Sequence, residues 1–384
     1  MRYRPLPDVP MQVGTALPFT VFDRTGKALL VKGHIIDSDL MLVRLQERGM
    51  VEETVGVPRS EPARPDEPRP RVAIERPTVR LRDAQDELTL IHRDLQAGTA
   101  HDATARVSAL AAQLRDAYEQ DPDQAMGLLQ LEATDHRLSR RLMHAAVLSQ
   151  VLALPSGLAA DHRLSLMCAA LTFDVALAPM SETLAAQNAP LSEAQWRAIQ
   201  EHTVGSAELL QRCGVSDPVW LAAVLDHHER VDGTGYPRAL RGEAVSIEAR
   251  ILGIVDIYSA MIRPRAYRDA QPSRVALRDI FLERGQRIDE RLATMFIKEL
   301  GVYPPGTMVK LANGEIAVAV RRSTDGAHPQ LRCVIGKDGA PLAYPQIRDS
   351  RNPETAIIEV VAASQYRSGL GSLNVLWARG ATAG

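Results

Sequence analysis

The chain has 384 residues, 45% of them hydrophobic, so it is long enough for two or three domains with a sizeable core. Lysine and arginine (45) nearly balance aspartate and glutamate (47), which gives a formal net charge of −2 at pH 7. This balance argues against a nucleic acid polymer or a membrane as partner, and an aromatic content of 4% disfavours stacking on single-stranded bases.

The cysteines and the N-terminal residues indicate a cytoplasmic protein. Cys168, Cys213 and Cys333 are far apart and lack CxxC spacing, which is typical of a reducing compartment and argues against a thiolate zinc site. The first residues contain no apolar segment of the kind found in signal peptides, and no apolar run approaches the length of a bilayer span. We therefore expect a cytoplasmic location and no membrane partner.

Residues 1–57 are predicted to form a small module of a β-hairpin and a helix. Two apolar segments, 16–23 and 28–31, flank a Thr-Gly turn as the strands of a hairpin do, and Asp37 can cap a helix that follows. The module carries no group of reactive side chains, so we expect a structural or regulatory role. Residues 58–78 are rich in Pro, Arg and Glu, which predicts a solvated linker.

The remainder of the chain divides into helical and β-prone parts. Residues 79–302 carry apolar residues at spacings of three and four, which predicts a core of amphipathic helices. In residues 303–365 short β-prone runs are separated by Asn-Gly and Asp-Gly turns; we predict strands near 307–311, 316–321, 331–335 and 356–361. Residues 366–384 are expected to be a flexible tail. The predicted class is a multidomain α+β protein with an all-α core between two small β-containing modules.

The densest chemistry in the sequence lies between Asp226 and Pro237. His227 and His228 are adjacent, and neighbouring residues on a helix point about 100° apart, so they can share one metal ion only where a helix ends. The glycines and the proline that follow supply such an end. The alternative is an ordinary helix end that carries two solvated histidines.

Further candidate ligands come from separate helical segments. Asp174 and Asp256 are each flanked by apolar residues, where a carboxylate costs free energy unless it is paired or bound to a metal. His144 and His202 add imidazoles from two more segments, an arrangement typical of metal sites inside helix bundles. Imidazoles and carboxylates without thiolates suit iron, manganese, zinc or nickel. The alternative is that these residues are relics packed as ordinary polar groups.

Residues from about His136 to about Arg268, and more loosely to about Tyr303, resemble an HD-GYP domain, the cyclic di-GMP phosphodiesterase branch of the HD superfamily. The stretch from His227 to Pro237 matches the signature HHExxDGxGYP of that family at every specified position. The segment that begins at Asp256 is similar to the second signature of the family.

The resemblance implies two divalent ions, with Asp174 as the carboxylate that bridges them. It assigns His202, His227 and His228 to one ion and His144 and Asp256 to the other; the implied metal ligands are His144, Asp174, His202, His227, His228 and Asp256. Asp174 and Asp256 are also the implied catalytic carboxylates. Arg265 and Arg268 match basic residues near the substrate phosphates, although arginines at a helix end are often simply solvated.

Several positions depart from the family pattern, among them Ala176 in place of a glycine and Ala266 in place of a proline. The His-Asp pair that defines the family reads Phe173-Asp174, so one metal site loses an imidazole. Leu177 stands where the family places a lysine near the scissile phosphate, and Arg140 stands where some members carry a glutamate for a third metal. We therefore expect one of the two metal sites to be weakened.

Three functions follow from the resemblance and its departures. The first is hydrolysis of cyclic di-GMP by a metal-bound hydroxide, with impaired activity. The second is a catalytically inactive domain that senses cyclic di-GMP, or that docks a diguanylate cyclase or another signalling protein through Gly235-Tyr236-Pro237. The third is an HD phosphohydrolase that acts on a different nucleotide.

Overall fold

The computed structural model describes residues 3–5, 17, 19–22, 28–34, 36, 45, 50–52, 77–100, 102–132, 138–263, 270–369 and 373–377. The chain divides into two compact units, Met1–Ile74 and Glu75–Gly384.

The first unit contains a small antiparallel sheet. Its strands, in the order β1-β4-β2-β3, are β1 (Tyr3–Pro5), β2 (Val21–Phe22), β3 (Ala28–Leu30) and β4 (Met50–Glu52). Pairing of β2 with β3 confirms the predicted hairpin. The helix expected after Asp37 lies outside the described residues apart from Leu45.

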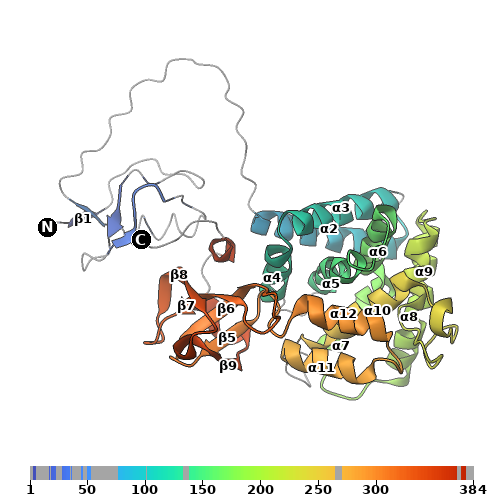
Figure 1. Cartoon of the computed structure of the whole chain (residues 1–384). Helices are drawn as coiled ribbons and strands as arrows, with labels where there is room; N and C mark the ends of the chain where they lie inside the picture. The colour runs from blue at the N-terminus through green and yellow to red at the C-terminus, as the bar shows by residue number, and fades with distance from the viewer. Residues whose placement is uncertain are drawn as a thin grey trace, which may run out of the picture. The chain divides into compact units, whose positions relative to one another are not determined.

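The second unit begins with a bundle of helices (Figure 1), which confirms the predicted all-α core. Its helices are α2 (Pro77–Ala97), α3 (Ala103–Gln120), α4 (Pro122–Glu132), α5 (Leu138–Ala153), α6 (Ala160–Thr172), α7 (Ser181–Ala186), α8 (Glu193–Arg212), α9 (Pro218–Asp226), α10 (Ile247–Met261), α11 (Ser273–Glu283) and α12 (Glu290–Leu300), with short 3-10 turns η1 (Val175–Met180) and η2 (Gly242–Ala244). Helix α5 is central, because it packs against α3, α4, α6, α10 and α12. The core of the bundle therefore surrounds the helix that carries His144.

The helices that approach the site begin at specific caps. Helix α8 begins at a capping box, in which the Ser192 hydroxyl accepts from the Gln195 backbone N–H and the Gln195 side chain accepts from the Ser192 N–H. Helix α9 begins at Asp217, whose carboxylate accepts from two backbone N–H groups, and Pro218 occupies its first turn. Helix α9 ends at Asp226, so the predicted helix end falls directly before His227.

One apolar stretch, residues 160–186, is long and apolar enough to cross a membrane by length and composition alone. In the structure it is divided among α6, η1 and α7, and 61% of its most apolar window is buried inside the protein. Helix α6 packs against α3, α5 and α9. Its apolar character is thus accounted for by its place in the core of the bundle.

The helices are followed by a five-stranded antiparallel sheet. Its strands, in the order β8-β7-β6-β5-β9, are β5 (Met308–Leu311), β6 (Ile316–Arg321), β7 (Gln330–Ile335), β8 (Pro341–Asp349) and β9 (Ile357–Val360). The four predicted strands are confirmed as β5, β6, β7 and β9. Strand β8 was not predicted, because Pro341 and Pro345 interrupt its pattern. Short 3-10 turns, η3 (Pro353–Thr355), η4 (Ala363–Gly369) and η5 (Leu373–Leu376), flank β9 and follow it.

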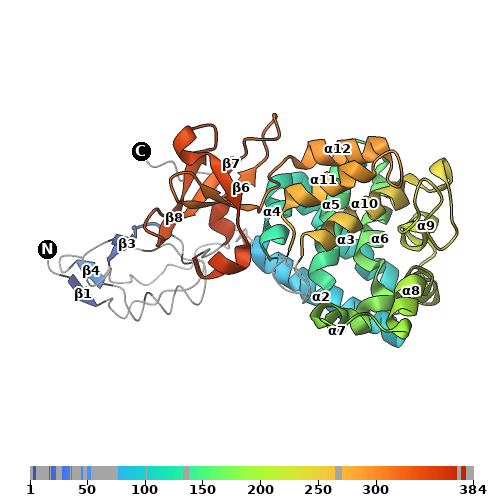
Figure 2. The same cartoon turned by 90° about the horizontal axis from the view of Figure 1, so that it is seen from below.

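The expectation of a flexible tail over residues 366–384 is wrong for its described part. Leu376 and Trp377 are buried, and the Trp377 indole N–H donates to the Val320 carbonyl at 2.8 Å. The ring lies so close to Gly127 of α4 that a Cβ there would meet it at 2.2 Å. Helix α4 also packs against β6, as Figure 2 shows. The tail therefore returns to the junction between helices and sheet.

Candidate metal centre

Three histidines converge where α8 and α9 face each other. His202 lies in the middle of α8, His227 caps the C-terminus of α9, and His228 follows. Helix α10 approaches them closely, since a Cβ at Gly253 would lie 2.6 Å from the His227 carbonyl oxygen. A glycine at position 253 is thus required for the observed packing of α10 against the end of α9.

The three imidazoles form a compact group of nitrogen donors. One ring nitrogen from each of His202, His227 and His228 lies within 4.8 Å of the other two. The rings are 4.3–5.2 Å apart between centroids, and His202 and His227 are buried. The structure therefore joins the two adjacent histidines of the signature to a third one from another helix.

Backbone hydrogen bonds orient two of these rings. The Nδ1 atom of His202 is 2.6 Å from the Ile199 carbonyl, and the Nδ1 atom of His227 is 2.8 Å from the Val224 carbonyl. A carbonyl oxygen can only accept, so each Nδ1 carries the proton and each Nε2 presents a lone pair. The two Nε2 atoms nevertheless lie 3.3 Å apart. A cation held between the two Nε2 atoms would satisfy both lone pairs.

A divalent ion fits this separation. Imidazole nitrogens bind such ions at about 2.0–2.1 Å, and ligand angles of about 90–110° place two of them about 3.0–3.4 Å apart. Burial lowers the pKa of His202 and lowers that of His228 to about 4, and burial together with the other two imidazoles lowers the pKa of His227. All three are therefore neutral near pH 7, the state in which imidazole binds metals.

The signature loop after His228 is held by a buried glutamate. The Glu229 carboxylate accepts from the backbone N–H of Arg238 at 2.6 Å and from that of Leu240 at 2.9 Å. The Tyr236 ring stacks on His228 with centroids 4.8 Å apart. A Cβ at Gly235 would lie 2.3 Å from the Arg230 backbone nitrogen, so only glycine fits there. The signature residues thus shape the loop that covers His228.

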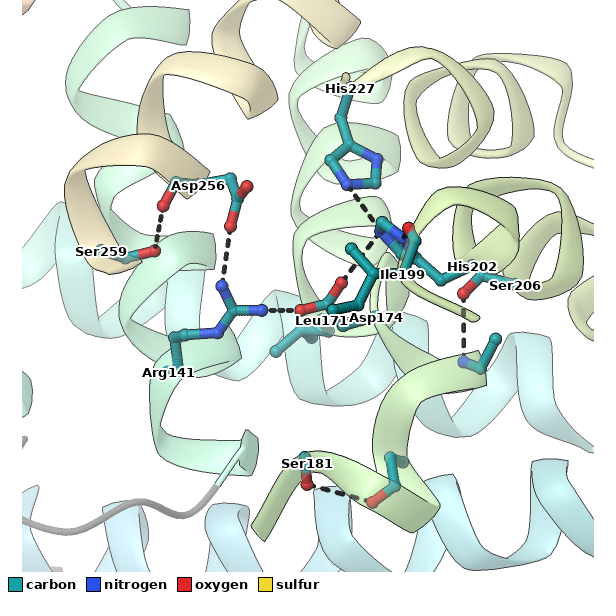
Figure 3. Close-up of polar contacts among 12 residues, drawn as sticks. Arg141, Leu171, Asp174, Ser181, Ile199, His202, Ser206, His227, Asp256 and Ser259 are labelled. Carbon is teal, nitrogen blue, oxygen red and sulfur yellow. Dashed lines mark hydrogen bonds and ion pairs between the residues drawn. The ribbon is translucent and has the colours of Figure 1, made fainter. Parts of the chain in front are cut away.

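The two predicted catalytic carboxylates are joined by an arginine. Arg141 of α5 forms an ion pair with Asp174 and donates to Asp256 Oδ1 at 2.7 Å (Figure 3). Asp174 also lies 3.2 Å from His202 Nε2 through its Oδ1 atom. The interactions drawn in Figure 3 therefore run without a break from Asp256 through Arg141, Asp174 and His202 to His227.

Charge compensation accounts for this ion-pair arrangement. Asp174 and Asp256 are both buried, and a buried carboxylate is costly without a partner. Burial would raise the pKa of Asp256, but the charge and hydrogen bond of Arg141 act together with His228 and His202 to hold the pKa below its ordinary value. The Arg141 guanidinium thus stabilises both carboxylates in their charged form.

Phe173 occupies the position of the missing imidazole. Its side chain is fully buried and meets the His227 ring edge to face, with centroids 4.8 Å apart. The Arg141 guanidinium carbon lies 5.2 Å from the centre of the Phe173 ring, within the range of a cation–π contact. A ring without a ligand atom therefore contacts both His227 and the arginine that pairs with the two carboxylates.

The remaining predicted site residues are His144, Arg265 and Arg268. Among the described residues, His144 is not one of the ligands that lie within 4.8 Å of one another, and its buried Nδ1 has no hydrogen-bond partner. Burial lowers the pKa of His144 to about 3. Arg265 and Arg268 lie outside the described residues. The roles assigned to these three residues thus stay predictions.

Reasoning from the sequence missed Arg141. It precedes His144 by three residues, so both lie on the same face of α5. That spacing, together with the loss of the imidazole at Phe173, is a signal that could have identified it. The residue that sequence reasoning did examine, Arg140, instead donates to Gln85 at 2.7 Å.

Comparison with known proteins identifies the domain. A family model described as an HD domain matches residues 126–292. That range holds the histidine group and the complete HHExxDGxGYP signature. Residues 126–292 form an HD domain of the HD-GYP family.

Several curated proteins are similar to this HD-GYP chain. It is 26% identical over 289 residues to the cyclic di-GMP phosphodiesterase PA4108 of Pseudomonas aeruginosa, a match that covers 72% of this chain and 67% of that protein. It is 32% identical over 160 residues to the 3′3′-cGAMP-specific phosphodiesterase 3 of Vibrio cholerae, covering 41% and 34%. It is 26% identical over 189 residues to the cyclic di-GMP phosphodiesterase PdeB of Borreliella burgdorferi, covering 49% of each. The matched part of the chain thus spans 34% of the length of the Vibrio cholerae protein and 49% of the length of PdeB.

Proposed function

We propose that this HD-GYP chain is a metal-dependent phosphodiesterase that hydrolyses cyclic di-GMP slowly. The observation that carries the proposal is the facing pair of unprotonated nitrogens on His202 and His227, 3.3 Å apart. Their geometry suits a divalent ion, and the class of substrate comes from relatives named as cyclic di-GMP and 3′3′-cGAMP phosphodiesterases. The ion is iron, manganese, zinc or nickel, since the donors are nitrogen and oxygen.

The histidine group and one carboxylate would hold the ion. His202, His227 and His228 supply three nitrogens, and Asp174 Oδ1 lies beside His202 Nε2 as a fourth donor. A bound ion at this position lowers the pKa of a water molecule and offsets charge on the phosphoryl group. In the overall reaction water adds to phosphorus, the bond from phosphorus to the 3′ oxygen breaks, and the linear dinucleotide pGpG leaves.

The other half of the centre explains why we expect slow turnover. Phe173 contributes no ligand, and Leu177 contributes no charge toward the phosphate. Two-metal hydrolysis needs the second ion to stabilise the leaving oxygen. Each loss of about 1.4 kcal/mol of transition-state stabilisation costs about tenfold in rate. Two absent groups are therefore enough to reduce the rate by orders of magnitude.

A second function is favoured by a specific observation. The ion pairs of Arg141 with Asp174 and Asp256 engage both carboxylates, while the Gly235-Tyr236-Pro237 loop keeps its supports. A domain in that state could bind cyclic di-GMP without turnover, or dock a diguanylate cyclase or another signalling protein through the loop. Turnover separates the two functions.

The test is metal analysis of anaerobically purified protein together with hydrolysis assays on cyclic di-GMP and 3′3′-cGAMP. The proposal predicts bound metal and slow formation of pGpG, both abolished by His227→Ala. Binding of cyclic di-GMP without product above the His227→Ala background would support the second function. Metal-free protein that neither binds nor hydrolyses either dinucleotide would contradict both.

A further inference from the structure

We infer that Arg141 is the resident cation of the second metal position, so that the centre accepts one divalent ion instead of two. This inference deepens the proposed function, because it specifies how many ions the centre holds. It rests on the ion pairs of Arg141 with Asp174 and Asp256, the two carboxylates that the resemblance assigns to the second ion.

The guanidinium of Arg141 lies between two buried carboxylates. Two different nitrogens of Arg141 engage the two carboxylates, one on Asp174 Oδ2 and the other on Asp256 Oδ1. A cation placed between two carboxylates does what a bridging metal ion does for them: it offsets their charge and fixes their separation. Only 15% of the Arg141 side chain is exposed, so this charge lies inside the protein.

The positive charge of Arg141 is permanent. Arginine keeps its proton at any physiological pH, so it cannot leave the site as a neutral group in the way a lysine can. A divalent ion that entered between Asp174 and Asp256 would be repelled by the positive charge of Arg141, which is paired with both carboxylates. Its binding there thus requires Arg141 to turn out of a buried ion pair.

The guanidinium of Arg141 also contacts an aromatic ring. Phe173, which replaces the imidazole ligand, lies under the guanidinium at 5.2 Å and stabilises a cation through its ring face. The same substitution therefore removes a metal ligand and adds a contact for arginine. Both changes favour Arg141 over a metal ion at this position.

The experiment counts Mn²⁺ ions on the full-length chain after chelation and titration with MnCl₂, by calorimetry and by metal analysis of the desalted protein. We expect one ion on the wild type and one on Phe173→His, because Arg141 still fills the second position. We expect two on the double variant Phe173→His with Arg141→Ala. The matched control is Phe173→His with Arg140→Ala, which removes the neighbouring arginine that bonds Gln85, and we expect one ion there.

The comparison of the two double variants decides the inference. Equal numbers of ions on them would overturn it, as would two ions of similar affinity on the wild type. A wild type without any ion would contradict the proposed histidine centre, and the difference between the double variants would still decide the role of Arg141. The two proposals therefore fail in distinguishable ways.

A second measurement tests the same inference with a single variant, in case a double variant does not fold. The single variant Arg141→Gln leaves Phe173 in place and frees both carboxylates for an ion. We expect Mn²⁺ to raise its melting temperature by several degrees more than it raises that of the wild type, and Arg140→Gln, at the neighbouring arginine that bonds Gln85, to behave like the wild type. An equal shift for Arg141→Gln and the wild type would overturn the inference.

Discussion

The two halves of this centre, one of histidines and one of carboxylates, differ in how positive charge reaches them. On the histidine side, ring nitrogens of His202, His227 and His228 lie within 4.8 Å of one another. On the carboxylate side, Asp174 and Asp256 are already paired with Arg141. One half therefore offers donors for a cation, and the other half already contains the cation of Arg141.

This contrast suggests a route by which a two-metal centre loses one ion and keeps its fold. Buried carboxylates must be compensated, and either a metal ion or an arginine can do so. In the proposed centre, Phe173 provides no imidazole for a second metal ion, and Arg141 of the neighbouring helix α5 supplies the positive charge. The signature loop after His228 does not depend on the second ion. It is held by the hydrogen bonds of Glu229 and by the close packing of Gly235 against the backbone of Arg230.

The largest expected effect comes from breaking the histidine side. His227→Ala removes one of three nitrogens, and we expect Mn²⁺ affinity to fall by at least about 100-fold, since even loss of the partners behind a ligand costs about 10–100-fold. His144→Ala on the other side should leave the affinity within about threefold of the wild type. Calorimetric titration measures both, and a loss of equal size in both variants would remove the distinction between the two halves.

A smaller effect is expected from disturbing the packing behind the histidines. In Gly253→Ala the new Cβ would lie 2.6 Å from the His227 carbonyl, so α10 must shift away from the end of α9. We expect the free energy of unfolding to fall by about 1–3 kcal/mol, as overpacking does, together with weaker Mn²⁺ binding.

Gly205→Ala on α8 is the matched control for Gly253→Ala. The nearest atom to its Cβ is 3.4 Å away, and alanine is the better helix former, so we expect no loss of stability. Urea unfolding of both variants tests this expectation. Equal stability of the two would mean that the approach of α10 is not tight.

The carboxylate side can be repaired by restoring the family residues. Phe173→His with Leu177→Lys returns a ligand and a charge for the phosphate, and Arg141→Ala vacates the second position. We expect Phe173→His with Leu177→Lys to hydrolyse cyclic di-GMP faster than the parent. The triple variant, which adds Arg141→Ala, should exceed the rate of the parent by about tenfold or more, which corresponds to about 1.4 kcal/mol in the barrier. If the parent already hydrolyses cyclic di-GMP at a rate that neither variant exceeds, our account of the missing ligand is wrong.

The smallest expected effect concerns the signature loop that follows His228. Glu229→Gln replaces an oxygen that accepts from a backbone N–H with an amide that cannot, and we expect a loss of about 1–2 kcal/mol in unfolding free energy. Glu243→Gln, at an exposed position of η2, should change stability by less than about 0.5 kcal/mol. Thermal unfolding compares them, and indistinguishable values would show that the Glu229 carboxylate does not hold the loop.

Local patterns predicted much of this molecule, because they depend on short stretches of chain. The helix end before His227 follows from the glycines and the proline after it, and the glycines of the β-sheet turns adopt positive φ as their sequence predicts. Strand β8 escaped prediction because it contains two prolines, which an edge strand tolerates, and β8 is at the edge of its sheet.

Tertiary contacts account for what the sequence did not predict. Trp377 is buried by Gly127 and Val320, residues that are distant in the chain. Arg141 has a long side chain, and the periodicity of α5 fixes its face but not the atoms that its guanidinium reaches. Such contacts depend on how helices pack, so a single sequence does not specify them.

Anomalous diffraction from crystals of the Mn²⁺-loaded protein tests the division between the two halves most directly. We predict one manganese peak, bound by His202, His227 and His228, with Arg141 still between Asp174 and Asp256. A manganese peak between the two carboxylates, with the arginine turned away, would contradict the account.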